Sequence, residues 1–216
     1  MSKVERRFFT TELRLDGGDG NGVIRGYAAL HYNGNKKNQS VTLPGGFRER
    51  LAKGCFTRAL AKGSDVKCMF NHDPNCILGR TSNGTMQVGC DDTGLHFNCQ
   101  LGKQSYAQDL RESIRTGLVN QCSFGFLMDD DPDSEDWGYD NDEETGERYA
   151  VRTIKNIGEL LDASPVTAPA YPATSCSARE LWPDGEPEVV LRAVGGGRRP
   201  VVVDDLQHRI AKARLF

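Results

Sequence analysis

The chain has 216 residues, of which 38% are hydrophobic and 26% charged, and its formal net charge is −3 at pH 7. This composition is typical of a folded globular domain, and the mild charge, together with the lack of any apolar run near the ~18 residues of a membrane span, gives no reason to expect a nucleic acid or membrane partner. The N-terminal M-S-K-V-E-R-R-F-F-T has no apolar signal-peptide core, and seven scattered cysteines favour reduced thiols over a secreted disulfide framework.

Short strands dominate the first half of the chain. Residues 23–30 (V-I-R-G-Y-A-A-L) indicate a strand, whereas residues 47–60 carry apolar side chains near helical spacing, interrupted by a glycine. Residues 65–70 indicate a short strand that runs into N-H-D-P. A hairpin across D-D-T-G is predicted from residues 85–88 and 95–101, where H-F-N-C-Q-L alternates as a half-buried strand does.

The second half opens with the clearest helix, residues 105–116, in which a serine N-cap precedes apolar residues at i, i+4 and i+8 and a glycine follows the end. Residues 122–128 indicate a strand. The stretch 129–147 holds eleven carboxylates and no Lys or Arg, which predicts a solvated loop or hairpin tip. Strand character resumes over residues 149–157 and 160–166.

The composition changes after Trp182, where P-D-G and G-G-G-R-R-P are typical of linkers and residues 201–216 are predicted to form a short basic helix. We therefore expect a domain over residues 1–182, with its core at 23–180, and a linker with a C-terminal tail at 183–216. Short strands with about three helices predict an α+β domain built on a mostly antiparallel sheet or barrel.

The stretch V-N-Q-C-S-F-G-F raises the question of chemistry, because Ser123 stands among buried-strand residues. A serine on a strand is ordinarily a hydroxyl on the solvent face. To act as a nucleophile it requires a base within hydrogen-bond reach and a third group that orients the base. G-x-S-x-G is absent here, which excludes the nucleophile-elbow hydrolases.

Of the four histidines, His72 best fits a general base, because it ends an apolar strand and Pro74 turns the chain immediately afterwards. Its alternative is a plain turn residue. For the third member, Asp162 is notable as an acid within an apolar strand, which is costly unless it has a partner. Glu159, at the edge of the same strand, remains an alternative for that role.

Two metal hypotheses follow from local spacing. Cys68, His72 and Cys76 form C-x3-H-x3-C, with Cys90 and Cys99 further on, but zinc sites prefer tighter pairs and a clear fourth ligand. Residues 140–146 resemble the start of an EF-hand loop, yet the glycine falls one place late and no flanking helices are evident. The sequence therefore predicts neither a metal site nor a cofactor.

The order of the motifs resembles that of the prohead (procapsid) maturation proteases of tailed bacteriophages, the HK97 type, over about residues 23–180. The motifs in chain order are G-Y-A-A-L, L-P-G-G-F, F-N-H-D-P with L-G-R, D-D-T-G-L-H-F, I-R-T-G-L-V-N-Q-C-S-F-G-F and L-L-D-A-S-P-V-T-A-P-A-Y-P-A-T. The family is distantly related in fold to herpesvirus capsid maturation proteases. The resemblance implies a small β-barrel surrounded by helices and a serine nucleophile.

The resemblance also assigns roles to individual residues. It places the family's histidine on His72, its serine on Ser123 and its acid on Asp162, where this chain has Asp instead of the usual Glu. The herpesvirus relatives use a second histidine as the third member, so the resemblance keeps His96 as an alternative to Asp162. Arg80 in L-G-R is implied as an oxyanion or substrate contact. Gly125 is expected to let a substrate backbone approach Ser123, because it has no side chain.

The implied function is that of a serine endopeptidase that cleaves the scaffolding segment of the major capsid protein, and itself, during procapsid maturation. It would work inside the assembling procapsid in the host bacterial cytoplasm. Further expectations are contacts with portal or other procapsid components, a homo-oligomer, and a tail that targets the capsid and is later clipped. The rivals are a catalytically inactive capsid- or scaffold-associated protein of the same fold, and a zinc-stabilised binding module.

Overall fold

The structure is a computed structural model that describes residues 4–9, 13–16, 22–34, 39–43 and 46–167. The described residues form thirteen strands and two α-helices, joined by loops and three 3-10 turns. The strands are β1 (Val4–Phe9), β2 (Leu13–Asp16), β3 (Val23–Leu30), β4 (Ser40–Thr42), β5 (Arg48–Leu51), β6 (Lys67–Met69), β7 (Ile77–Arg80), β8 (Met86–Cys90), β9 (Gly94–Gln100), β10 (Gln121–Met128), β11 (Glu135–Asn141), β12 (Arg148–Ile154) and β13 (Ile157–Val166). The helices are α1 (Thr57–Ala61) and α2 (Ser105–Arg115), and the 3-10 turns are η1 (Phe70–His72), η2 (Thr81–Asn83) and η3 (Pro132–Ser134).

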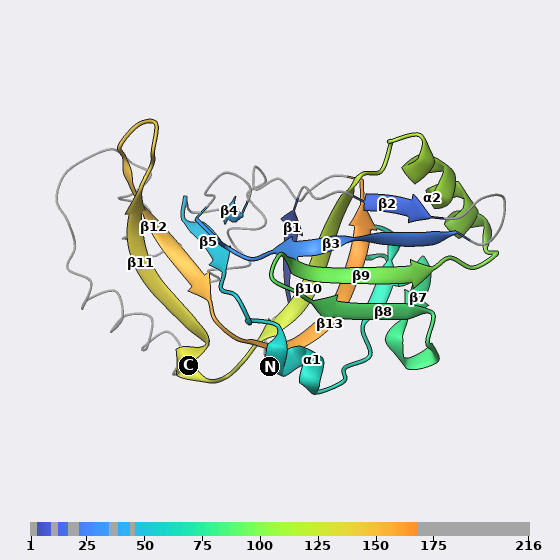
Figure 1. Cartoon of the computed structure of the whole chain (residues 1–216), viewed down its shortest axis with the longest axis horizontal. Helices are drawn as coiled ribbons and strands as arrows, with labels where there is room; N and C mark the ends of the chain where they lie inside the picture. The colour runs from blue at the N-terminus through green and yellow to red at the C-terminus, as the bar shows by residue number, and fades with distance from the viewer. Residues whose placement is uncertain (1–3, 10–12, 17–21, 35–38, 44–45, 168–216) are drawn as a thin grey trace.

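Three sheets make up the fold (Figure 1). The first has strand order β1-β10-β13-β6-β7, the second β11-β12-β5-β4 and the third β2-β3-β9-β8. Most neighbours are antiparallel, but β12 with β5 and β13 with β6 are parallel. Within the described residues each sheet keeps two open edge strands, so the predicted closed barrel is wrong, and two short helices do not surround the sheets. The α+β class with a mostly antiparallel sheet is confirmed.

The predicted strand at 23–30, the hairpin of β8 and β9 and the helix α2 are confirmed. The helical spacing over residues 47–60 was misleading, because residues 48–51 form β5 and only residues 57–61 are helical. In β5 the buried positions alternate, and one of them is occupied by the charged Glu49 beside Leu51. A buried charge in the strand hid its period of two from a pattern based on hydrophobicity.

The acidic stretch 129–147 is more ordered than predicted. Part of it forms β11, which pairs along its length with β12, and the turn that joins the two strands is the predicted hairpin tip. Its carboxylates also have cationic partners on β5, because Arg48 binds Asp142 and Arg50 binds Asp140. These ion pairs tie the hairpin to β5 within the second sheet, so its charges are not left to water alone.

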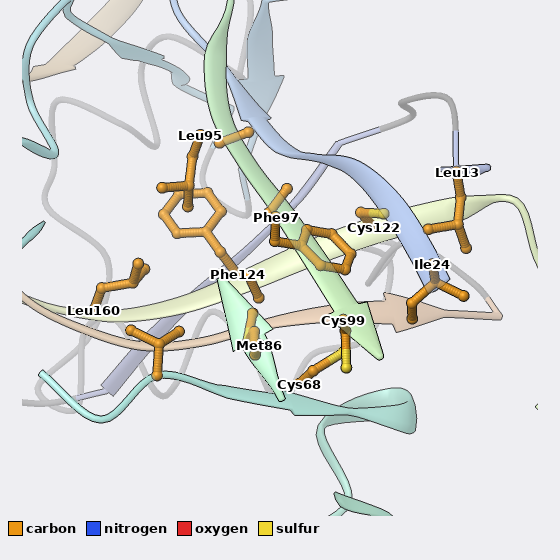
Figure 2. Packing of buried hydrophobic residues seen from close by; sticks show 14 of the residues in the cluster. Leu13, Ile24, Cys68, Met86, Leu95, Phe97, Cys99, Cys122, Phe124 and Leu160 are labelled. Carbon is orange, nitrogen blue, oxygen red and sulfur yellow. The ribbon is translucent and has the colours of Figure 1, made fainter. Parts of the chain in front are cut away.

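The hydrophobic core lies between the first and third sheets (Figure 2). Phe124 of β10 and Phe97 of β9 project into it, and Met86 of β8 and Leu160 of β13 lie close by. Phe124 stacks on Phe126 at 5.1 Å between ring centroids. This packing fixes which face of β10 is turned inward, and therefore which face is left for polar side chains.

The predicted linker, tail and terminal helix at 183–216 lie outside the described residues. None of the described helices is long and apolar enough to cross a bilayer. The described cysteines, which are Cys55, Cys68, Cys76, Cys90, Cys99 and Cys122, are free thiols.

Candidate active site

Ser123 lies on the face of β10 that is turned away from the aromatic core. Side chains alternate along a strand, so the burial of Phe124 and Phe126 in the core directs Ser123 and Gly125 to the opposite face. That face is covered too, because Ser123 has no exposed surface. A fully buried hydroxyl requires hydrogen-bond partners, which argues against an idle residue on a solvent face.

The neighbouring strand β13 brings an acid to the same face. In the antiparallel register Gly125 stands opposite Asp162 and Ser123 opposite Ser164. Asp162 is 2% exposed. A carboxylate buried to this extent is costly unless other groups donate hydrogen bonds to it.

His72 comes from the turn η1, which directly follows β6 in the same sheet. Asn71 has φ 54° and His72 has φ 57°, so two consecutive non-glycine residues lie in the left-handed region. Such backbone costs of the order of 1–3 kcal/mol per residue and persists only where surrounding contacts hold it. One such contact joins the turn to the end of β13, where the backbone N–H of Thr167 donates to Asn71 Oδ1 at 2.9 Å.

The side chains of Ser123, His72 and Asp162 are linked through the two ring nitrogens of the histidine. His72 Nε2 lies 2.7 Å from Ser123 Oγ, and His72 Nδ1 lies 2.7 Å from Asp162 Oδ1. Both ring nitrogens are therefore within hydrogen-bond distance of a partner, one a hydroxyl and the other a carboxylate. This is the arrangement in which an imidazole can accept a proton from a serine while an acid fixes its orientation.

Ser164 supports the acid from the same strand. Its hydroxyl donates to Asp162 Oδ1 at 3.0 Å and accepts from the backbone N–H of Met69 at 3.2 Å. The hydroxyl thus ties the carboxylate of β13 to the strand that leads into His72. Sequence reasoning did not identify Ser164, although its position two residues after Asp162 in D-A-S places both on one strand face.

Glycine is needed at position 125 for a different reason from the one expected. A Cβ at this position would lie 2.5 Å from Asp162 Oδ2 and 3.7 Å from Cγ of Arg6. The space beside Gly125 is thus filled by the acid of the site, and is not left open for a substrate backbone. Only glycine leaves room for the carboxylate at this distance from β10.

Arg80 does not join the site, which corrects the predicted oxyanion contact. It lies on β7, three strand spacings across the sheet from β10, or roughly 14 Å at about 4.8 Å for each spacing. Its guanidinium is bound by Asp65, with Nε donating to Oδ1 at 3.1 Å. The ion pair with Asp65 at the far edge of the sheet therefore gives Arg80 a structural role.

The structure does not bring the two alternative third members to His72. Glu159 is exposed on β13 opposite Leu127. His96 belongs to β9 in another sheet, where its ring lies edge-on to Tyr27 at 6.1 Å between centroids. Asp162 is the acid in contact with the histidine.

The metal hypotheses find no support in the geometry. Both ring nitrogens of His72 face Ser123 and Asp162, so the ring is committed away from Cys68 and Cys76. Burial raises the pKa of the Cys68 thiol well above its usual value, with the hydrogen bond to Cys99 adding to the effect. No group of three or more metal-binding side chains occurs in the part of the chain that the structure describes.

A mostly β fold that buries a linked acid, histidine and serine defines a candidate serine hydrolase. The comparison with protein families agrees, because the family model described as caudovirus prohead serine protease matches residues 9–183. The chain belongs to this family, which is a family of serine proteases, and the resemblance seen in the sequence is thereby confirmed.

Among solved structures, the bacteriophage T4 capsid assembly protease, gp21, is similar to this chain with a TM-score of 0.47 and 12% sequence identity. The similarity covers 77% of this chain and 98% of that one. No curated protein matches the sequence.

Proposed function

We propose that this protein is a serine endopeptidase that cleaves the scaffolding segment of the major capsid protein, and itself, during procapsid maturation. The observation that carries the proposal is the pair of 2.7 Å contacts that link Ser123 to His72 and His72 to Asp162. Membership of the prohead serine protease family supports the capsid protein as substrate.

The proposed mechanism is acyl transfer. His72 accepts the Ser123 hydroxyl proton through Nε2 while Oγ forms a bond to the scissile carbonyl carbon. Asp162 holds the Nδ1–H and stabilises the imidazolium, and backbone N–H groups near Ser123 receive the oxyanion. The C–N bond then breaks and the amine leaves with the proton from His72. Water, activated by the same histidine, cleaves the ester and restores Ser123.

Co-expression with the cognate major capsid protein tests the proposal. We expect wild type to shorten the capsid protein and the Ser123→Ala variant to leave it at full length, as read by intact mass. Loss of the serine should lower the rate by a factor on the order of 10⁶, the loss measured for another serine protease. If wild type also leaves the capsid protein uncut in assembled procapsids, the proposal fails.

The same experiment separates the main rival. An inactive capsid-associated protein of the same fold would act through binding alone, so Ser123→Ala would leave maturation intact. The working location would be the interior of the assembling procapsid in the host bacterial cytoplasm, with portal or other procapsid components and a second copy of the chain as further partners.

A further inference from the structure

Strand β1 lies directly against the strand that carries Ser123. It pairs antiparallel with β10 over all six of its residues and forms the outer edge of the first sheet. The family model begins to match at residue 9, so all of β1 except its last residue precedes the matched part of the chain. An extended segment added beside a catalytic strand is the way in which many peptides bind to proteins.

The register brings one peptide carbonyl of β1 to the nucleophile. Phe8 stands opposite Ser123, and Ser123 Oγ lies 2.9 Å from the carbonyl oxygen of Arg7. The single hydroxyl proton can be donated either to this oxygen or to His72 Nε2, and it has to rotate to Nε2 before Oγ attacks. A C=O bond measures about 1.23 Å, so the carbonyl carbon of Arg7 lies within about 4.1 Å of Ser123 Oγ. The carbonyl oxygen is the nearer atom in this structure, so attack at the ~3–3.5 Å of a near-attack geometry requires the carbonyl to turn its carbon toward Oγ.

The side chain of this residue occupies a buried acidic pocket. Arg7 is 4% exposed, and its guanidinium binds both carboxylate oxygens of Glu49, with Nη2 donating to Oε2 at 2.9 Å. The pocket is completed by Arg152, whose Nη1 donates to Glu49 Oε2 at 2.9 Å, and by Glu135, which binds Arg152. The Arg7 guanidinium also lies 5.5 Å from the ring centroid of Phe126.

The charges of the pocket favour a cation from outside. Glu49, Glu135 and Arg152 come from β5, β11 and β12, and together they carry two negative charges and one positive charge. Strand β1 adds Arg7, which binds Glu49, and also Glu5, which binds both Arg7 and Arg152. The full cluster therefore holds three acids and two arginines, and an acid in place of Arg7 would leave four acids and one arginine. A buried cluster with an uncompensated charge is costly, so a basic side chain is favoured over a neutral or acidic one.

We propose that β1 lies in the substrate groove and that the site binds extended peptides with a basic residue at the place of Arg7, directly before the bond that is cut. This inference rests on the proposed function and specifies its substrate. In the bound peptide, Ser123 Oγ attacks the carbonyl carbon of the basic residue, and the amine of the next residue leaves with the proton from His72. In the structure the groove is filled, so β1 competes with any other substrate strand.

The experiment uses the full-length protein and an eight-residue fluorogenic peptide with the sequence of residues 4–11, V-E-R-R-F-F-T-T. A second peptide carries Glu in place of the second arginine. Wild type, Arg7→Ala and the control Arg14→Ala are compared, the last because Arg14 is an exposed residue of the same type on β2. Product masses locate the cut.

We expect the arginine peptide to be cut after its second arginine, at least about 10-fold faster than the glutamate peptide. Arg7→Ala should cut it about 10-fold faster than wild type, because β1 loses its anchoring side chain, and Arg14→Ala should match wild type. The ratio of the cleavage rates of the two peptides is also measured with the wild-type protein, so it does not depend on the folding of a variant. In a second variant, Glu49→Gln, the preference for the arginine peptide should fall to about 2-fold.

Equal or faster cleavage of the glutamate peptide, or a cut at another bond, overturns the inference. So does failure to cut either peptide by a protein that still shortens the capsid protein, in which case the proposed function stands. If neither peptide nor capsid protein is cut, the proposed function itself has failed.

Discussion

Replacement of Gly125 by alanine tests whether the Asp162 carboxylate must lie in the space directly beside this residue of β10. The added Cβ would lie 2.5 Å from Asp162 Oδ2, whereas ordinary Cβ contacts begin at 3.4 Å. The carboxylate would have to move by about 0.9 Å, the difference between these two distances. It is nearly fully buried, and its other oxygen is held at 2.7 Å by His72 and at 3.0 Å by Ser164.

A displacement of this size breaks the contact with the histidine. If the carboxylate moves away from β10, the distance from His72 Nδ1 to Asp162 Oδ1 grows from 2.7 Å toward about 3.6 Å, which is no longer a hydrogen bond. Misplacement of a catalytic group by ~1 Å can cost about 10²-fold in rate. We therefore expect kcat of Gly125→Ala to fall about 100-fold, with KM nearly unchanged.

The assay is cleavage of the capsid protein or of a peptide substrate, with thermal unfolding measured on the same samples. Gly138→Ala is the matched control, because Gly138 also lies within a strand but a Cβ there would meet nothing within 4 Å. The control should keep wild-type activity. A Gly125→Ala protein with wild-type kcat would show that the carboxylate does not need this position, and the assignment of Asp162 would lose its support.

Two further predictions concern buried polar groups. Ser164→Ala removes a donor to Asp162 and the acceptor of the Met69 N–H, so the free energy of unfolding measured in urea should fall by about 1.5–3 kcal/mol; no change would show that water replaces the hydroxyl. Burial lowers the pKa of His31 below its ordinary value of 6.5, so the unfolded chain takes up the proton first. The contribution of His31 to the free energy of unfolding is therefore fully present above about pH 6.5. It declines as the pH falls toward the folded-state pKa, by at most about 1.4 kcal/mol per pH unit. The free energy of unfolding, measured with urea at pH 7.5 and 5.5, should fall less between these two pH values in His31→Phe than in wild type. An equal fall in both proteins would show that other groups cause the pH dependence.

The sequence could identify the catalytic candidates because each of them breaks its local pattern. Ser123 and Asp162 are polar residues within apolar strands, and His72 stands where a strand ends at a turn. Each of these departures from local expectation is costly unless a tertiary contact compensates it. Their spatial meeting follows only from the order of β10, β13 and β6 in one sheet, which local patterns do not specify.

The contacts of β1 could not be predicted in this way. The hydrogen bond from Ser123 to Arg7 joins residues 116 positions apart, and the pocket for the guanidinium is built from β5, β11 and β12. The burial of Glu49 could not be predicted, because a pattern based on hydrophobicity assigns any charged residue to the surface. Its partner Arg152 lies a further 103 positions along the chain. Buried ion pairs of this kind depend on topology more than on local sequence.

The register of β10 links the stability of the core to the chemistry of the site. Phe124 and Phe126 occupy the core on one face, and for that reason Ser123 and Gly125 must lie on the other. A shift of one residue would turn both aromatic rings out of the core and carry the serine hydroxyl into it. The burial of two phenylalanine rings, typically worth about 1.5–3 kcal/mol each, therefore opposes any slip that would separate Ser123 from His72. The same register fixes which peptide bond of β1, or of a competing strand, faces the serine.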